Sequence, residues 1–486
     1  MNSVVPEEMT FKDIERNFYE DACRDARNRL AEFLKTADKQ IMESRDKNEY
    51  RHRGIRHTSI KTLMGTVPVE RAYYKRILED GGTERVFLLD KELGFNTTGT
   101  ISPNLAEKMA SHICEMTYRE VAEAVSGLTD QSITPQGTWN LIQIIGERQK
   151  EAEKELMNDF KDGNLCGEKV MPVIFEEADG MMVSLQERNS KKRKKKIELK
   201  AGIMYEGWEE RYLSSKEYKT VNKTAFAGFM KTKDFKCLRE SLLAEKYETD
   251  SITHRILNGD GASWIKEDND DAAYVMQLDQ FHIKKAIVRN VADKKARRYI
   301  TKELREGHCG KVLEKIESLK HECGGEVKEV KKLRDLERYI RKNAEHVMPY
   351  KEREGINLPQ SPEGVEYRTL GTMEKNISIF AKRFKGGKSW SRDGAENLAK
   401  IIALKMGAGF NGKIAGLVSG RVSDKMVERF EEEVRNTTNT VSKRITKNVY
   451  QLHRGELPFS NCYTTNGRKA IRKMFDIKPF TEMTYR

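Results

Sequence analysis

The spacing of apolar residues divides the first third of the chain into a helix, a hairpin and a helical region. In residues 8–50, apolar side chains recur near helical spacing within a highly charged segment. This pattern predicts an amphipathic helix that packs on the next module or dimerises. Residues 57–95 alternate instead and turn at Gly65, which predicts a basic β-hairpin. Helical spacing returns over residues 103–147, and a charged helical connector is expected over 148–165.

Two of these helices are joined by a short turn near residue 130. The first, Tyr118–Leu128, is expected to stop at Gly127, and Thr134 is a good N-cap for the second, with Pro135 at its first position. This is the helix-turn-helix pattern, whose second helix enters the major groove in DNA-binding proteins. Two helices joined by a turn also occur without DNA, so the pattern leaves both interpretations open.

Beyond residue 166, short apolar runs alternate with helical segments, which predicts a mixed α/β sheet. Strands are expected at 170–175, 197–205, 254–258 and 272–278, and helices at 225–247 and 280–287. Ligands of such sheets gather at the carboxyl ends of strands. Three acids are predicted to lie at strand ends: Asp179, Asp260 and Asp279.

The last part of the chain is mostly helical. Residues 291–365 are very charged and predict a helical insertion that forms an arm or lid. Helices at 373–383 and 395–406 flank a basic loop, and residues 407–486 predict a basic, loosely helical tail. The loop sequence Gly-Gly-Lys-Ser at 386–389 lacks the upstream glycine and strand of a P-loop, which argues against nucleotide binding.

Charge and cysteine content narrow the class of protein. The chain has 89 lysine and arginine residues against 76 aspartate and glutamate residues, a net charge of +13. This suits binding to nucleic acid and equally suits a helical protein with a lysine-rich surface. Seven scattered cysteines without a Cys-x-x-Cys pair indicate a reducing cytosol rather than a disulfide scaffold or zinc ribbon. No apolar run approaches the length of a membrane span.

Asp179, Asp260 and Glu374 could together form a metal site. Two Mg²⁺ ions about 3.5–4 Å apart can clamp the attacking and leaving oxygens of a phosphoryl transfer. Mg²⁺ prefers oxygen ligands, which two acids at strand ends and a third on a helix packed across the sheet would supply. A lone acid of this kind is more often a surface carboxylate, and the spacing alone leaves the two interpretations near balance.

Four stretches of the chain resemble bacterial insertion-sequence transposases of the ISLre type: Glu177–Gly180, Asn258–Ile265, Leu278–His282 and Gly371–Ala395. These are relatives of Mutator-like transposases with a ribonuclease-H-like catalytic domain, and the resemblance covers nearly the whole chain. The fold class that it implies is an α/β core, with a ribonuclease-H-like mixed sheet flanked by helices and a helical insertion. Mainly helical N-terminal and C-terminal regions would bind DNA.

The resemblance implies a DDE transposase that cleaves insertion-sequence ends and joins the 3′-hydroxyl to target DNA, using two Mg²⁺ ions that Mn²⁺ can replace. Asp179 and Asp260 match the first two acids; Glu374 matches the third, with Glu396 as its rival. An auxiliary element after the second acid matches Asp279 and His282. The residues expected to hold DNA are Lys191, Lys192, Arg193, Lys284, Arg383, Trp390 and Arg392, although Trp390 could equally cover the sheet.

The N-terminal part is expected to contain a helix for oligomerisation (1–56), a basic hairpin (57–102) and a helix-turn-helix-like region with its connector (103–165). The first part of the core (166–290), the helical insertion (291–366), the final part of the core (367–410) and a basic tail (411–486) are expected to follow. The expected partners are double-stranded DNA, as terminal inverted repeats and target, and further copies of the chain, in the bacterial cytoplasm near the nucleoid. Two alternatives remain open. The chain could be an inactive or regulatory DNA-binding protein, or a metal-dependent nuclease of the same fold.

Overall fold

The computed structural model describes residues 9–78, 81–94, 100–129, 131–186, 195–212, 215–266, 274–324, 326–420, 422–432 and 434–435. The chain forms two compact units, Met1–Arg421 and Val422–Arg486. In the second unit, residues 424–432 are helical. Most of the predicted C-terminal region lies outside the described residues, as do Lys191, Lys192 and Arg193.

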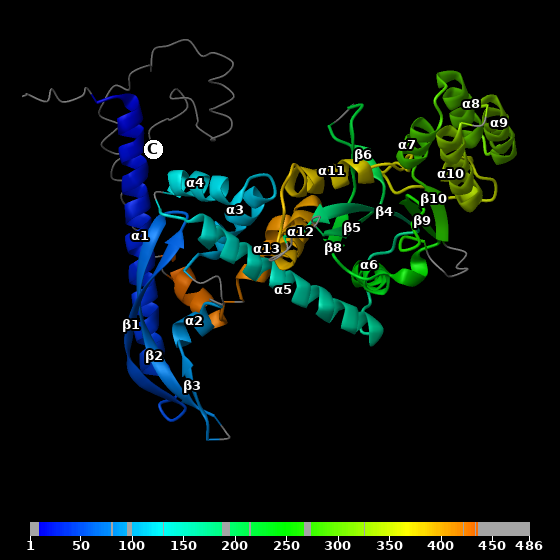
Figure 1. Ribbon diagram of the computed structural model, residues 1–486. Coiled ribbons are helices and arrows are strands. Elements are labelled where there is room, and N and C mark those ends of the chain that lie inside the picture. The colour runs from blue at the N-terminus through cyan, green and yellow to red at the C-terminus, as the bar shows by residue number, and fades with distance from the viewer. Residues whose placement is uncertain are drawn as a thin grey trace, which may run out of the picture. The chain divides into compact units, whose positions relative to one another are not determined.

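The N-terminal part combines one long helix with a small antiparallel sheet (Figure 1). Helix α1 (Phe11–Ser44) packs on a sheet of three strands in the order β1 (Tyr50–Thr62), β2 (Gly65–Ile77) and β3 (Thr83–Val86), which helix α2 (Leu88–Glu92) follows. The hairpin predicted at Gly65 is confirmed, and Gly65 has a φ of +111°, which favours glycine. Asp38 of α1 is buried and accepts a hydrogen bond of 2.9 Å from the Ala72 amide.

Three helices follow: α3 (Pro103–Ile113), α4 (Tyr118–Thr129) and α5 (Pro135–Lys161). The predicted N-cap of α5 is confirmed, because Thr134 Oγ1 accepts a hydrogen bond of 3.0 Å from the Gly137 amide. The prediction that α4 ends at Gly127 is wrong, since the helix continues to Thr129. The predicted connector is the second half of α5, and a buried ion pair between Glu153 and Lys400 ties it to α12 (Arg392–Met406).

The central sheet is mixed, which confirms the α/β class. Its strand order is β10-β9-β4-β5-β8. Strands β9 (His254–Gly259) and β10 (Tyr274–Leu278) run parallel to β4 (Val173–Ser184), whereas β5 (Lys196–Tyr205) and β8 (Thr224–Gly228) complete an antiparallel set. A separate two-stranded ribbon joins β6 (Trp208–Glu210) to β7 (Tyr218–Thr220).

The helix predicted over 225–247 is wrong in its first residues. They form strand β8, and helix α6 begins only at Thr232 and ends at Lys246. The reason is packing on both faces of the sheet, because Ala225 and Ala227 join the core on one side while Phe226 joins the core on the other. A short run that is buried on both faces of a sheet cannot be assigned to a helix or a strand from periodicity alone.

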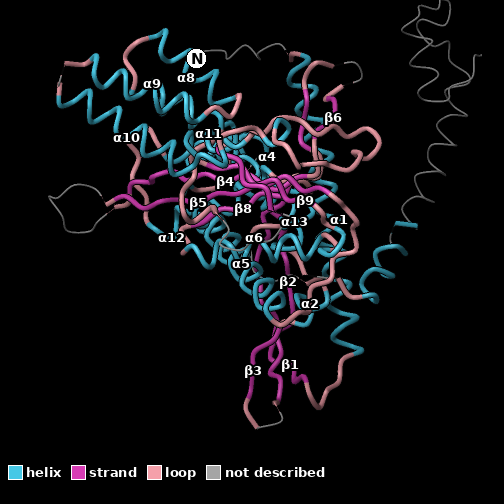
Figure 2. The backbone as a smooth tube through the Cα atoms, turned by 90° about the vertical axis from the view of Figure 1, so that its right-hand side faces the viewer, coloured by secondary structure: helices cyan, strands magenta, loops and turns pink. Residues whose placement is uncertain are grey.

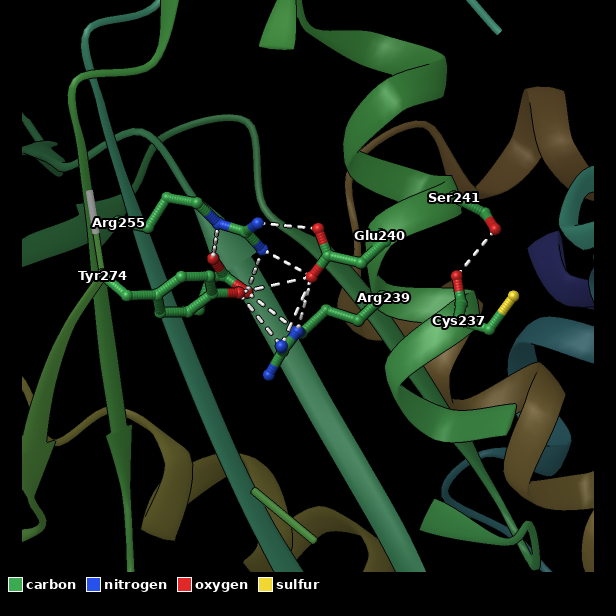
Figure 3. A network of polar contacts seen from close by, with 7 residues as sticks. Cys237, Arg239, Glu240, Ser241, Arg255 and Tyr274 are labelled. Atoms are coloured by element: carbon green, nitrogen blue, oxygen red, sulfur yellow. Dashed lines mark hydrogen bonds and ion pairs between the residues drawn. The ribbon is translucent and has the colours of Figure 1, made fainter. Parts of the chain in front are cut away.

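Helices cover both faces of this sheet (Figure 1). One face packs against α12 and against α11 (Met373–Phe384), and α13 (Phe410–Val418) and α3 to α5 join the same core. The other face packs against α6. Figure 3 shows the polar network on the α6 side, where Arg239 and Glu240 of α6 meet Arg255 of β9 and Tyr274 of β10. Within it, Arg255 Nε lies 2.7 Å from Oε1 of Glu176 on β4.

The predicted helical insertion is confirmed for its first part. After α7 (Gln280–Asn290), the helices α8 (Lys294–Arg305), α9 (Cys309–Glu322) and α10 (Val327–Asn343) lie side by side (Figure 2). They share a small apolar core with α7 that includes Ile300, Val312 and Leu336. The 3-10 turns Ala344–His346 and Tyr350–Glu352 follow, and residues 353–366 return to the core without forming a helix; a third such turn, Thr249–Ser251, precedes β9.

No helix in the described part of the chain combines the length and the apolar character needed to cross a membrane. The cysteines in the described part are free thiols: Cys23, Cys114, Cys166, Cys237, Cys309 and Cys323.

Candidate metal centre

Asp179 lies in the middle of β4, so the prediction that it ends a strand is wrong. The strand continues to Ser184 because β4 stays paired with β5, and Asp179 itself pairs with Ala201. The parallel ladder to β9 ends earlier, at the pair Glu177 and Asn258. Asp179 therefore lies just beyond the last residue of β4 that pairs with β9. The residue is 7% exposed, and its Oδ1 accepts a hydrogen bond of 2.7 Å from the Gly180 amide.

Asp260 and Asp279 directly follow β9 and β10, which confirms their predicted places at strand ends. The carboxyl ends of parallel neighbours lie at the same edge of a sheet, so Asp260 and Asp279 lie together, beside the part of β4 that carries Asp179. Oδ1 of Asp260 accepts a hydrogen bond of 2.8 Å from the Ala262 amide, across Gly261 with a φ of +87°. Asp279 is the N-cap of α7, and its Oδ1 accepts a hydrogen bond of 2.7 Å from the Phe281 amide.

The first turns of α7 and α11 bring two more side chains to Asp179. His282 Nε2 lies 3.4 Å from Asp179 Oδ2. Glu374 completes a cluster with these two residues, in which one ligand atom from each lies within 4.8 Å of the others. Asp260 is not part of this close group, and its Oδ1 accepts a hydrogen bond from its own loop.

The two candidate third acids lie at different parts of the sheet. Glu374 is in the first turn of α11, which packs on β4. Glu396 lies on α12 beside Gly228 of β8, where its Oε1 is 3.4 Å from the position that a Cβ on Gly228 would take. Strand β8 is the edge strand farthest from β9 and β10. The geometry therefore groups Glu374, and not Glu396, with Asp179.

The charges of the acids are felt by the groups beside them. The hydrogen bond that His282 donates to the Asp179 carboxylate raises the pKa of His282 against the opposing effect of burial, and the negative charges of Asp179, Asp279 and Asp260 raise it further. Burial raises the pKa of Tyr339, and Asp260 and Asp279 raise it further. Negative charge is thus concentrated around Asp179 on β4 and the carboxyl ends of β9 and β10, which is an environment that favours a cation.

A cavity of about 620 Å³ opens over Asp179, His282 and Glu374. Four exposed lysines also line this cavity and were not among the residues expected to hold DNA: Lys196, Lys285, Lys385 and Lys388. The last two flank Gly386 and Gly387, which both have a φ of +80°. Acids at the centre and lysines around them provide contacts for a cation and for phosphate groups in one place.

The residues that were expected to hold DNA have different surroundings. Lys284 and Arg392 are exposed. Arg383 is only 3% exposed, and its Nε donates a hydrogen bond of 3.0 Å to the Ile113 carbonyl. The predicted contact of Arg383 with DNA is therefore wrong, because its guanidinium is enclosed by the core. Trp390 packs edge-to-face on Phe384, with ring centroids 5.1 Å apart. It lies against the core, as the alternative that it covers the sheet predicts.

The sequence analysis missed the role of Glu177. This residue is 1% exposed, and it accepts hydrogen bonds from Asn258 and from the backbone that leads into α11. A signal was present, since Glu177 stands two residues before Asp179 in a strand whose other neighbours are largely apolar. The sequence alone does not identify this role, because the partners of Glu177 at the start of α11 lie far away in the chain.

Comparison with known proteins places the chain in a family. The model of the Uncharacterised protein family (UPF0236) matches residues 4–417. The chain belongs to the UPF0236 family. It is 26% identical over 386 residues to a UPF0236 protein named for eleven loci of Caldanaerobacter subterraneus subsp. tengcongensis, covering 78% of this chain and 72% of that protein.

Two further UPF0236 proteins show similar agreement. One is named for four loci of the same organism and is 24% identical over 387 residues, which cover 78% of this chain and 72% of the relative. The other, named for its place in the vanSb 3′ region of Streptococcus gallolyticus, is 23% identical over 386 residues, which cover 77% of this chain and 78% of the relative. The family match thus includes the whole central sheet and the candidate metal centre.

Proposed function

We propose that this UPF0236 chain is a DNA transposase of the ISLre type that cleaves insertion-sequence ends and joins the 3′-hydroxyl to target DNA. The observation that carries the proposal is the cluster of Asp179, His282 and Glu374 at the open edge of the sheet, with Asp260 after the neighbouring strand. Three antiparallel strands, with two parallel strands beside the first of them, are also the arrangement expected of a ribonuclease-H-like domain.

The donor groups at this edge fit a divalent cation. Asp179 and Glu374, with Asp260 from the next strand, would hold two Mg²⁺ ions, for which Mn²⁺ can substitute, because carboxylates are the ligands that these ions prefer. Bound ions would supply an activated water and charge neutralisation for phosphoryl transfer. His282 would orient the Asp179 carboxylate that it contacts. The lysines around the cavity would hold the DNA phosphates.

The names of two relatives support a mobile element. One is named for eleven loci of a single genome and another for four. A DNA element that copies itself leaves many copies of its gene in one genome. A protein encoded at many loci of one genome is therefore expected of such an element. For the present chain this supports a role in moving DNA over a role in metabolism.

Other described parts of the chain suit the proposed partners. The start of α5 presents exposed Gln136, Trp139 and Asn140, polar and aromatic groups suited to contacts in a DNA groove. The first half of α1 exposes Phe11 and Phe18, which suits contact with a second copy of the chain. A DNA substrate would place the protein at the bacterial nucleoid.

Cleavage of DNA that carries the inverted repeats flanking the gene tests the proposal. The purified chain should nick these ends only with Mg²⁺ or Mn²⁺ and should form joined product with a target duplex. Asp260→Ala should abolish both steps and leave end binding intact. Binding without metal-dependent cleavage would point to a non-enzymatic DNA-binding protein, and cleavage without joined product to a nuclease. Cleavage by Asp260→Ala at the wild-type rate would remove Asp260 from the site.

A further inference from the structure

The elements that carry the proposed metal site are tied together below it by one buried hydrogen-bonded network. The network joins β4, β9, the start of α7 and the start of α11. Four members of the network each stand two or three residues before a residue of the site: Glu177 before Asp179, Asn258 before Asp260, Asp279 before His282, and Thr372 before Glu374. The network is thus placed to set the distances between these elements.

Glu177 is the centre of this network. Its Oε1 accepts hydrogen bonds from the Tyr205 hydroxyl at 2.7 Å, the Thr372 amide at 3.1 Å and Thr372 Oγ1 at 2.5 Å. Its Oε2 accepts hydrogen bonds from Asn258 Nδ2 at 2.9 Å, the Gly371 amide at 3.1 Å and the Met373 amide at 3.2 Å. One carboxylate on β4 therefore receives three backbone amides from the start of α11.

These contacts give α11 an N-terminal cap from outside the helix. The first amides of a helix lack partners within the helix, and its N-terminus favours negative charge. Thr372, the N-cap residue, uses its hydroxyl to donate to Glu177 and makes no side-chain cap of its own. Glu374 lies one residue beyond Met373, so its position depends on where Glu177 holds the helix start.

The same network extends to α7. Asn258 Nδ2 also donates a hydrogen bond of 2.8 Å to Asp279 Oδ2. The other oxygen of Asp279 accepts hydrogen bonds from the Phe281 and His282 amides. His282 and Glu374 therefore approach Asp179 from two helices whose first turns are linked through Glu177 and Asn258.

We propose that Glu177 is a positioning residue, which fixes the start of α11 against β4 so that Glu374 and Asp179 can bind the same divalent cation. The inference rests on the proposed function and adds a residue that the DDE pattern does not contain. Glu177 does not line the cavity, so it acts through the contacts described. In Glu177→Gln an amide group that can only donate replaces one acceptor oxygen among the surrounding donors, which moves the helix start.

The neighbouring Glu176 provides a matched control. It is as buried as Glu177, at 1% exposed, and lies on the same strand. Its carboxylate points to the opposite face, where it pairs with Arg255 and Arg239 in the network of Figure 3. Glu176→Gln thus disturbs a buried network of similar size that does not contact α11.

The test compares Mn²⁺ binding to the full chain, by electron paramagnetic resonance, with the Mn²⁺ requirement for cleavage. Glu177→Gln should weaken Mn²⁺ binding by about tenfold or more and raise the Mn²⁺ concentration for half-maximal cleavage by a similar factor. Glu176→Gln should lower the thermal midpoint without either shift. A folded Glu177→Gln chain that binds Mn²⁺ like the wild type overturns the proposal, and so does an equal loss in Glu176→Gln.

A milder pair of variants covers the case in which Glu177→Gln does not fold. Thr372→Val removes one hydroxyl donor to Glu177 and should weaken Mn²⁺ binding severalfold, whereas Thr372→Ser should keep wild-type binding. Wild-type binding by Thr372→Val would then overturn the proposal. A wild-type chain that binds Mn²⁺ but cuts no DNA removes the transposase proposal and leaves this one standing. A wild-type chain that binds no Mn²⁺ overturns both.

Discussion

At the scale of single residues, Glu240 illustrates how arginines on the α6 face of the sheet stabilise a partly buried carboxylate. Burial by itself would raise its pKa, but the hydrogen bonds and charge of Arg255, with the charge of Arg239, outweigh burial and lower it. A carboxyl whose pKa is lowered by folding stabilises the fold above its unfolded value of 4.5, and this contribution is lost as the pH falls through the lower, folded value. The network of Figure 3 therefore weakens in acid.

We predict that Glu240→Gln lowers the free energy of unfolding near neutral pH by roughly 1–3 kcal/mol, because it removes the charged partner of Arg255 and Arg239. The difference from wild type should shrink as the pH falls below 4.5. Thermal unfolding followed by circular dichroism across this range measures both chains. A difference that stays constant down to about pH 3 would contradict the role given to this carboxylate.

The third acid can be identified with two matched variants. Glu374→Gln should reduce metal-dependent cleavage by about two orders of magnitude or more, since Glu374 clusters with Asp179 and His282. Glu396→Gln should leave cleavage within about twofold of wild type, because Glu396 lies beside the edge strand β8. Cleavage rates at saturating Mg²⁺ decide between them. The opposite pattern would make Glu396 the third acid.

At the scale of elements, the contact between α5 and α12 depends on a glycine. A Cβ on Gly146 would lie 2.3 Å from the Cβ of Asn397, so the two helices could not keep their present spacing. Gly146→Ala should lower the free energy of unfolding by about 1–3 kcal/mol, as overpacking does.

In α4, Gly127 has nothing within 4 Å of its Cβ position. Gly127→Ala should instead stabilise by about 0.5–1 kcal/mol. Chemical denaturation of both variants measures the contrast, and equal effects would contradict it.

Elements with local signals could be predicted from the sequence. The Gly65 hairpin, the Thr134 cap and the strands before Asp260 and Asp279 all follow from residues within one turn or strand. Strand β8 could not be distinguished from a helix, because its apolar run is short and buried on both faces. Asp179 was misplaced because the β4–β5 pairing outlasts the parallel ladder.

The candidate site was predictable only in part. Residue types and strand ends pointed to Asp260 and Asp279, and Glu374 was proposed as an acid on a helix packed across the sheet, a choice that the resemblance supported. The meeting of His282 and Glu374 at Asp179 depends on how α7 and α11 dock, which no spacing in the sequence states. The prediction that Arg383 contacts DNA was wrong for a related reason, because the enclosure of Arg383 beside Ile113 depends on the packing of distant segments.

At the scale of the whole molecule, the net charge of +13 should make DNA binding strongly dependent on salt. Each phosphate neutralised contributes about −0.9 to the slope of log K against log salt concentration. The double change Lys385→Gln and Lys388→Gln should flatten this slope by about 2, because both lysines border the cavity. Fluorescence anisotropy over a salt series measures the slope.

The control keeps the charge change and moves it to the other face. Lys231 and Lys233 are exposed at the start of α6, which covers the opposite side of the sheet. Replacing both by glutamine should leave the slope near that of wild type. An equal flattening by both pairs would show that the lysines act through net charge and not through contact with DNA.

The separation of Glu177 and Thr372 by 195 residues has a consequence for folding. Contacts between distant segments form late, because the entropy cost of closing a long loop must be met before the contacts stabilise the chain. The insertion helices have an apolar core of their own and can gather before that closure. Until α11 arrives, the carboxylate of Glu177 lacks the backbone donors that satisfy it in the folded chain. We therefore expect a chain emerging from the ribosome to carry Asp179 and Asp260 well before it can complete the site. Docking of α11 would then be the step that turns a folding intermediate into a metal-binding protein.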